Sequence, residues 1–210
     1  MQIKQFVFNG FAENTYVLYD DSREAVIIDP GCYGKEEENR LKNFVLEKDL
    51  KVDKLLNTHC HIDHVLGNYF VKNTFQVSLY IHDIEVPYLA SVASYAPNYG
   101  FTNYQSTEAD ESIRAGENIA FGNQELEVLF TPGHSAGHVV FYHAPSKILI
   151  GGDVLFRQSI GRTDLPGGDH EQLLESIRKN LWPLPDDVVV YSGHGPETTI
   201  GFEKKNNPYL

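Results

Sequence analysis

The stretch NTHCHIDHVLGN, residues 57–68, places three histidines, one aspartate and one cysteine within six consecutive positions. It follows the segment KVDKLL (51–56), which ends in two leucines and favours a short strand. Neutral imidazole and carboxylate groups are good ligands for Zn²⁺ and for non-haem iron. Chance polar decoration of a loop is the alternative, and the tight spacing disfavours it. The stretch therefore predicts a metal site at the end of a strand.

The spacing within this stretch assigns its side chains to different faces. His59 and His61 are two positions apart, so in an extended segment they face the same side. Cys60 then faces the core, and we leave it out of the predicted site. Asp63 and His64 follow after a bend, where they can face a second metal ion.

Further candidate ligands stand just beyond other apolar runs. His134 lies in FTPGHSAGH, Asp153 in LIGGDVLF and His194 in YSGHG. Side chains delivered to one rim by several strands are expected where loops above a rigid sheet build a site. We interpret the remaining four histidines as solvated surface residues: His82, His138, His143 and His170.

Strand and helix patterns come in two similar halves. Expected strands cover residues 4–8, 14–20, 24–28, 51–59, 76–83, 117–134, 137–145, 147–156 and 186–195. Expected helices cover residues 34–50, 64–75 and 169–182, while residues 84–115 predict one or two helical turns and a long loop. This order predicts an α/β domain in which helices cover the outer faces of the sheets. We see no domain boundary and expect one domain over residues 1–210.

Composition narrows the class of protein. The formal charge of −12 argues against a nucleic-acid partner, which would need clusters of Lys and Arg. No apolar run approaches the roughly 18 residues of a membrane span, and residues 1–21 alternate like a strand pair, unlike a signal peptide. We therefore expect a cytoplasmic protein without a membrane partner. The two cysteines define no disulfide framework.

Together these motifs resemble those of the metallo-β-lactamase superfamily. THCHIDH resembles its HxHxDH motif, and TPGHSAGH, GGDVLF and SGHG resemble its later histidine and aspartate segments. AVIIDPG resembles its early strand, which ends in an aspartate that supports the metal ligands, here Asp29. The resemblance implies an αββα sandwich. IGGDVLFRQSIGRTDLPGG is most similar to the glyoxalase II branch, and to its short, single-domain bacterial members.

The resemblance also implies a ligand set and a mechanism. It implies one metal ion held by His59, His61 and His134, a second held by Asp63, His64 and His194, and Asp153 as the bridging ligand. Zinc is the first expectation for the two divalent ions, with iron or manganese as alternatives. Asp63 would also act in catalysis by orienting the attacking water or taking its proton.

Three features beyond the ligands bear on the substrate. Arg162 is the candidate substrate-binding cation, and pairing with Asp164 is the alternative. Tyrosines between residues 87 and 100 either line the mouth of the site or pack on the sheet edge. Sixteen residues follow His194, too few for the C-terminal helical domain with which longer glyoxalase II enzymes bind glutathione.

The expected function is metal-dependent hydrolysis of a thioester, such as S-D-lactoylglutathione or a similar acyl thiol. The rival is a persulfide dioxygenase of the same fold, which by resemblance would hold one iron at His59, His134 and Asp153. A metal-binding module without catalysis is a further alternative. The acyl group, the thiol carrier and the oligomeric state are left open by the sequence.

Overall fold

The computed structural model describes residues 1–210, and the chain divides into two compact units. The first unit comprises Met1–Ser112 and Ala120–Gln124, and the second comprises Ile113–Ile119 and Glu125–Leu210. No helix in the chain is long and apolar enough to cross a membrane.

The first unit is built on a six-stranded sheet with the order β1-β2-β3-β4-β5-β6. Its strands are β1 (Gln2–Phe8), β2 (Glu13–Tyr19), β3 (Glu24–Ile28), β4 (Lys51–Leu56), β5 (Ser78–His82) and β6 (Glu111–Ile113). Its helices are α1 (Lys35–Glu47), α2 (Ile62–Val65), α3 (Asn68–Phe75) and α4 (Val86–Tyr95), with 3₁₀ turns η1 (Asp83–Glu85) and η2 (Ala96–Tyr99).

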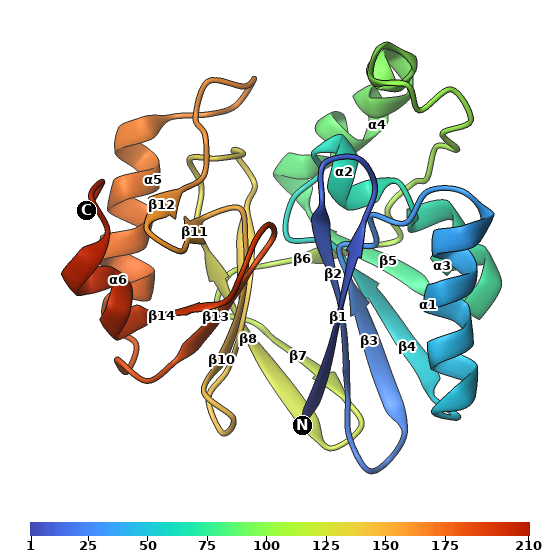
Figure 1. Ribbon diagram of the computed structural model, residues 1–210, viewed down its shortest axis with the longest axis horizontal. Coiled ribbons are helices and arrows are strands. Elements are labelled where there is room, and N and C mark those ends of the chain that lie inside the picture. The colour runs from blue at the N-terminus through green and yellow to red at the C-terminus, as the bar shows by residue number, and fades with distance from the viewer. The chain divides into compact units, whose positions relative to one another are not determined.

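Helices α1, α3 and α4 contribute to one hydrophobic core with the strands. Leu41 and Val45 of α1 are four positions apart, so they lie on the same helical face, and both are buried in this core. In Figure 1, α1 and α3 lie beside β4 on the same side of the sheet. Strands β3, β4 and β5 pair in parallel, so their carboxyl ends meet at one edge. The segments after β3 and β4 therefore leave the sheet next to each other.

The second unit has a six-stranded sheet with the order β14-β13-β10-β9-β8-β7. Its strands are β7 (Asn118–Phe121), β8 (Gln124–Phe130), β9 (Val139–His143), β10 (Ile148–Gly152), β13 (Val189–Ser192) and β14 (Thr198–Thr199). The remaining elements are a small hairpin of β11 (Leu155–Phe156) and β12 (Ser159–Ile160), α5 (His170–Ser176), a π-helical turn η3 (Ile177–Leu181) and α6 (Ile200–Asn206).

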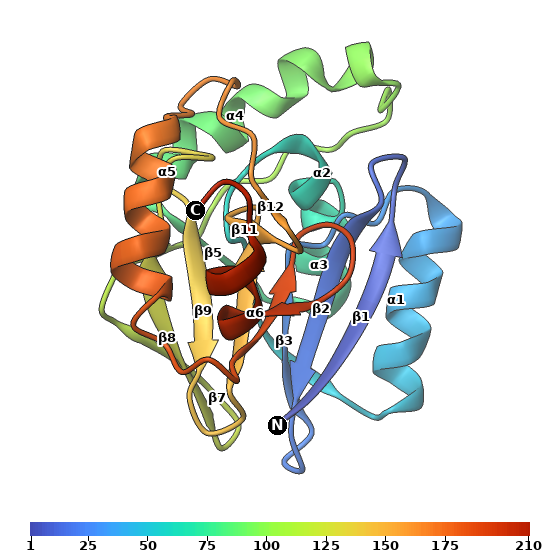
Figure 2. The same cartoon turned by 60° about the vertical axis from the view of Figure 1, so that its left-hand side comes forward.

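Helices α5 and α6 cover one face of this sheet, as Figure 2 shows. Leu173 and Ile177 pack with Val140 and Val190 in a buried cluster, so the helices close the apolar face of the strands. Strands β10 and β13 pair in parallel and end at Gly152 and Ser192. The residues that follow these two strands therefore leave from the same edge of the sheet.

The elements largely follow the sequence prediction, with differences at particular residues. The expected helix over 64–75 is divided into α2 and α3, because the chain turns at Gly67. Residues 84–115 hold a ten-residue helix, α4, which is longer than expected. Helix α6 was not predicted; its N-cap Thr199 accepts a hydrogen bond from the Phe202 amide at 3.2 Å.

Candidate metal centre

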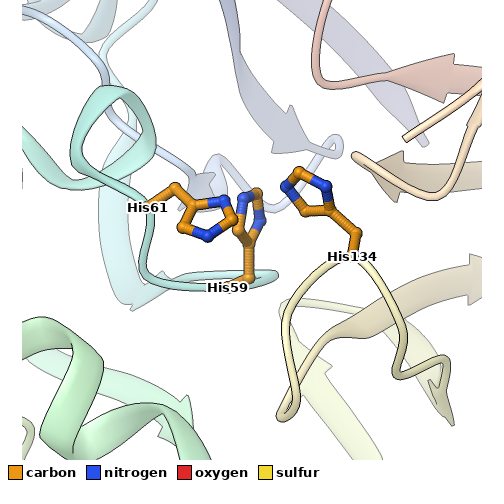
Figure 3. Close-up of side chains that lie close together, drawn as sticks. All are labelled: His59, His61 and His134. Atoms are coloured by element: carbon orange, nitrogen blue, oxygen red, sulfur yellow. The ribbon is translucent and has the colours of Figure 1, made fainter. Parts of the chain in front are cut away.

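The segment after β4 carries the first pair of predicted ligands. It leaves the sheet after the Asn57 amide donates to the Tyr80 carbonyl at 3.1 Å, and α2 begins at Ile62. The rings of His59 and His61 meet edge to face with their centroids 4.8 Å apart, as Figure 3 shows. His59 is fully buried and His61 is partly exposed. The two side chains therefore lie together, as the spacing predicted.

Asp29 and Thr58 fix the orientation of the His59 ring. The Thr58 amide donates to Asp29 Oδ1 at 2.7 Å, and the Thr58 hydroxyl donates to Asp29 Oδ2 at 2.6 Å. Thr58 Oγ1 is also 3.0 Å from His59 Nδ1. Because the hydroxyl has only one proton, and Asp29 receives it, the oxygen must accept from His59 Nδ1–H. His59 Nε2 is then the nitrogen that can bind a metal.

His64 and Asp63 complete the predicted ligands of the first unit. His64 is fully buried; its Nδ1 is 3.2 Å from Asp29 Oδ2, and its Nε2 is 3.7 Å from Asp63 Oδ2. One ligand atom each from Asp29, His59 and His64 lies within 4.8 Å of the others. The Asp63 carbonyl accepts from Asn9 Nδ2 at 3.0 Å, which ties α2 to the β1–β2 turn. The first unit thus gathers four imidazole and carboxylate candidates next to Asp29.

Cys60, between the two histidines, belongs to the core. Its amide donates to Glu85 Oε2 at 2.8 Å, and both residues are fully buried. Burial raises the pKa of the Cys60 thiol, and the negative charges of Glu85 and Asp29 raise it further. The inward orientation predicted for Cys60 is confirmed, and Glu85 is a support for this loop that the sequence analysis missed.

The second unit gathers the other three predicted ligands. Figure 3 draws His134 on the loop that follows β8. Its Nδ1 is 2.7 Å from the Arg162 carbonyl oxygen, so Nδ1 carries the proton and Nε2 is the nitrogen that can bind a metal. Asp153 Oδ2 is 3.5 Å from His134 Nε2 and 3.5 Å from His194 Nε2. One carboxylate oxygen therefore lies within reach of both histidines.

A glycine allows the chain to pass close to Asp153. A Cβ atom on Gly161 would lie 1.9 Å from the Asp153 carbonyl oxygen and 3.1 Å from His134 Nδ1. The first distance is far below van der Waals contact, so any side chain here would displace the backbone that carries Asp153. Gly161 therefore permits the tight packing of the hairpin against the ligand loops.

Arg162 contributes to the site through its backbone. Its guanidinium forms two hydrogen bonds of 2.7 Å with Asp164, and both side chains are more than half exposed. The hydrogen bond from Arg162 lowers the pKa of Asp164 to about 2. This is the ion pair that the sequence analysis named as the alternative for Arg162. An exposed pair of this kind contributes little to stability.

Two histidines were wrongly predicted to be solvated. His138 is fully buried and His143 is 2% exposed. His138 Nε2 accepts the Asp153 amide hydrogen at 3.1 Å. The one signal in the sequence is that His138 directly precedes the apolar run VVFY and His143 directly follows it. His82 is partly exposed and His170 is exposed, as predicted.

Two of the tyrosines near α4 take the packing role, and the mouth-lining role stays a prediction. Tyr88 and Tyr95 pack against the core of the first unit, whereas Tyr99 is 55% exposed. Burial raises the pKa of Tyr95 to about 12, and the charge of Asp63 adds to this effect. Packing is therefore the role that the contacts of Tyr88 and Tyr95 support.

Comparison with known proteins gives matches over nearly the whole chain. The family model described as "Metallo-beta-lactamase superfamily" matches residues 9–194. Hydroxyacylglutathione hydrolase GloC from Haemophilus influenzae is 38% identical over 212 residues, which cover 100% of this chain and 98% of that protein.

Solved structures agree with the sequence matches. BLEG-1 B3 metallo-β-lactamase superposes with a TM-score of 0.91 at 39% identity, covering 100% of this chain and 99% of that one. TTHA1623 in a di-iron-bound form gives 0.86 at 31% identity, covering 99% and 100% of the two chains. ETHE1 from Myxococcus xanthus gives 0.80 at 28% identity, covering 99% and 84%. The predicted α/β fold of the αββα type is confirmed by these matches.

Proposed function

Because this chain belongs to the metallo-β-lactamase superfamily, we propose that it is a metal-dependent hydrolase of thioesters. The observation that carries the proposal is the full-length similarity to hydroxyacylglutathione hydrolase GloC, together with the complete set of ligand types. The substrate would be a small acyl thiol such as S-D-lactoylglutathione. Hydrolysis breaks the carbon–sulfur bond and releases a carboxylic acid and a thiol.

We propose that the two sets of candidate ligands hold two divalent metal ions. His59, His61 and His134 would hold one, Asp63, His64 and His194 the other, and Asp153 would bridge them. The residues fit such ions chemically. In three histidines Nδ1 contacts another protein group: Thr58 in His59, Asp29 in His64 and the Arg162 carbonyl in His134. In each of them Nε2 is therefore the nitrogen that can bind a metal.

Zinc is the first candidate for both ions, and the similarity to a di-iron protein supports iron as the alternative. When bound, such ions lower the pKa of a bound water toward ~7 and polarise a carbonyl oxygen. Asp63 would orient that water and hold its proton on a carboxylate oxygen. Asp29 would hold Thr58 and His64 in place, so it would affect the reaction only by positioning the metal ligands.

The first test is the metal content per chain of protein purified without added metal or chelator. We expect close to two ions and thioester hydrolysis under anaerobic conditions. Asp63→Asn is expected to reduce turnover at least about 100-fold with the fold retained, because the amide cannot take a proton. Unchanged thioester hydrolysis in Asp63→Asn would contradict the role of this residue. Two bound ions without hydrolysis of any thioester would point to the module without catalysis.

A persulfide dioxygenase is the second candidate. The similarity to ETHE1 supports it, and a single iron held by His59, His134 and Asp153 would leave positions open for O₂ and substrate. A content of one iron per chain, with oxygen uptake in the presence of glutathione persulfide, would replace the hydrolase with this activity.

Arg162 remains a proposed substrate contact, in competition with its ion pair to Asp164. If Arg162 binds a substrate carboxylate, Arg162→Ala should raise KM, whereas an unchanged KM would leave only the structural pair. We also propose a cytoplasmic location, which the two free thiols of Cys32 and Cys60 support because reducing compartments preserve thiols.

A further inference from the structure

His138 directly precedes β9, at the edge of the sheet where β8 and β10 end. Strand β9 pairs with β10 through Ile150 and Phe141, and the same register, continued, brings His138 opposite Asp153. Strand β9 pairs with β8 through Phe130 and Val139, and the same register brings His138 opposite Thr131. His138 therefore stands just before the middle strand β9, between Thr131, which follows β8, and Asp153, which follows β10.

The backbone carbonyl and the side chain of His138 accept hydrogen bonds from different neighbours. On the β8 side, the Thr131 amide donates to the His138 carbonyl at 2.9 Å. On the β10 side, the strand bends at Gly152, which has a φ of +45°. There the Asp153 amide donates at 3.1 Å to Nε2 of the His138 side chain. The imidazole thus supplies the acceptor for the Asp153 amide just beyond the last paired residues of β9 and β10.

The hydrogen bonds define the protonation of His138. A nitrogen that accepts an amide hydrogen must present its lone pair, so Nε2 is unprotonated. The proton is then on Nδ1, which is 3.2 Å from Thr131 Oγ1 and donates to it. His138 and Thr131 are both fully buried. The ring is a neutral bridge between the ends of β8 and β10.

We propose that His138 is a positioning residue for Asp153, a role that rests on the proposed metal site. The backbone amide of Asp153 donates a hydrogen bond to His138, and its carbonyl oxygen packs closely against Gly161. The carboxylate of Asp153 leaves this fixed backbone and lies 3.5 Å from the Nε2 atoms of His134 and His194. His138 therefore acts on the carboxylate through the Asp153 backbone, and its ring also packs edge to face on that of His134, with the centroids 6.1 Å apart.

Two substitutions separate the two hydrogen bonds of the ring. In His138→Asn, the amide can reach the position of Nδ1, which lies toward Thr131, but ends short of the Asp153 amide. In His138→Gln, the longer side chain can bring a carbonyl oxygen to the position of Nε2. His138→Asn thus removes the acceptor for the Asp153 amide and His138→Gln replaces it, and neither variant changes the side-chain volume much.

The first measurement is hydrogen exchange at the Asp153 amide in chelator-treated full-length protein. We expect exchange to be roughly tenfold faster in His138→Asn than in the wild type, and close to the wild-type rate in His138→Gln. The amide of Val190 in β13 serves as the control for global stability, because Val190 is buried in the core of the same unit and its amide makes no bond to His138. Equal exchange at Asp153 in the wild type and His138→Asn would overturn the proposal.

The second measurement is binding of cobalt(II), followed by its visible absorption spectrum. We expect His138→Asn to weaken binding about 10–100-fold and to change the spectrum, with both restored in His138→Gln. A wild-type spectrum and affinity in His138→Asn would overturn the positioning role. If the wild type itself binds no metal, the proposed function fails, while amide exchange still decides whether His138 holds Asp153.

The wild-type protein provides a test that needs no variant to fold. Nitrogen-15 NMR of the imidazole distinguishes the two neutral tautomers and the protonated ring. We expect His138 to carry its proton on Nδ1 and to keep Nε2 unprotonated at pH 7. A proton on Nε2 would exclude acceptance of the Asp153 amide hydrogen and would refute the proposal.

Discussion

Replacement of Thr58 by valine should destabilise the first unit without changing the shape of its side chain. The hydroxyl of Thr58 donates to Asp29 Oδ2 at 2.6 Å and accepts from His59 Nδ1–H, and all three residues are buried. A hydrogen bond to a carboxylate contributes about 1.5–3 kcal/mol, and a buried donor that loses its acceptor costs about 1–3 kcal/mol. We expect Thr58→Val to lower the free energy of unfolding by about 3 kcal/mol.

The measurement is urea unfolding of chelator-treated protein, followed by far-ultraviolet circular dichroism, which reports on the strands and helices of the first unit as well as those of the second. In thermal unfolding the same loss corresponds to a decrease in Tm of roughly 6–12 °C for a chain of this size. Thr58→Ser is the matched control, since it keeps the oxygen and loses one methyl group, at a cost of about 0.8 kcal/mol. Equal stabilities of Thr58→Val and Thr58→Ser would refute the role of the hydroxyl.

The remaining predictions concern close packing and pH. Gly161→Ala should lower the free energy of unfolding by about 2 kcal/mol and reduce metal content, because a Cβ would meet the Asp153 carbonyl at 1.9 Å. Gly10→Ala, with no atom within 4 Å, should be within about 0.5 kcal/mol of the wild type in thermal unfolding. Burial raises the pKa of Asp20, but hydrogen bonds from Ser22, Gln124 and Asn123 outweigh it and hold the pKa below its usual value. A lowered pKa stabilises the fold above the ordinary value of 3.8, and that contribution is lost as pH falls below it. Asp20→Asn should therefore be less stable than the wild type at pH 7, with a gap in urea unfolding that narrows at pH 3; a gap independent of pH would contradict this.

Local patterns in the sequence were sufficient for most elements of the fold. Alternation and apolar runs predicted the main strands of both units, and the spacing of Leu41 and Val45 predicted the helix that became α1. The interruption between α2 and α3 and the whole of α6 were not predicted. These short elements depend on packing and caps, which a hydrophobic pattern of a few residues does not reveal.

The candidate ligands were also accessible from the sequence, because they concentrate at the ends of apolar runs. Their spacing predicted His59, His61, Asp63 and His64 as ligands, and positions after strands predicted His134, Asp153 and His194. The predictions for His138 and His143 were wrong, because a position beside an apolar run does not by itself distinguish a buried histidine from a solvated one. The structure corrected the interpretation of His138 through one contact, the hydrogen bond from the Asp153 amide.

The sequence by itself determined which residues have side chains that can bind metal and which strands those residues follow, since both properties are local. Only the tertiary structure decided which ring nitrogen of His59, His64 and His134 can bind a metal. That choice depends on partners distant in sequence: Asp29 is 35 residues from His64, and Arg162 is 28 residues from His134. The contacts of Glu85, His138 and Gly161 with the site also depend on the tertiary structure. A hydrogen bond or a close approach exists only after the chain has brought the two residues concerned together.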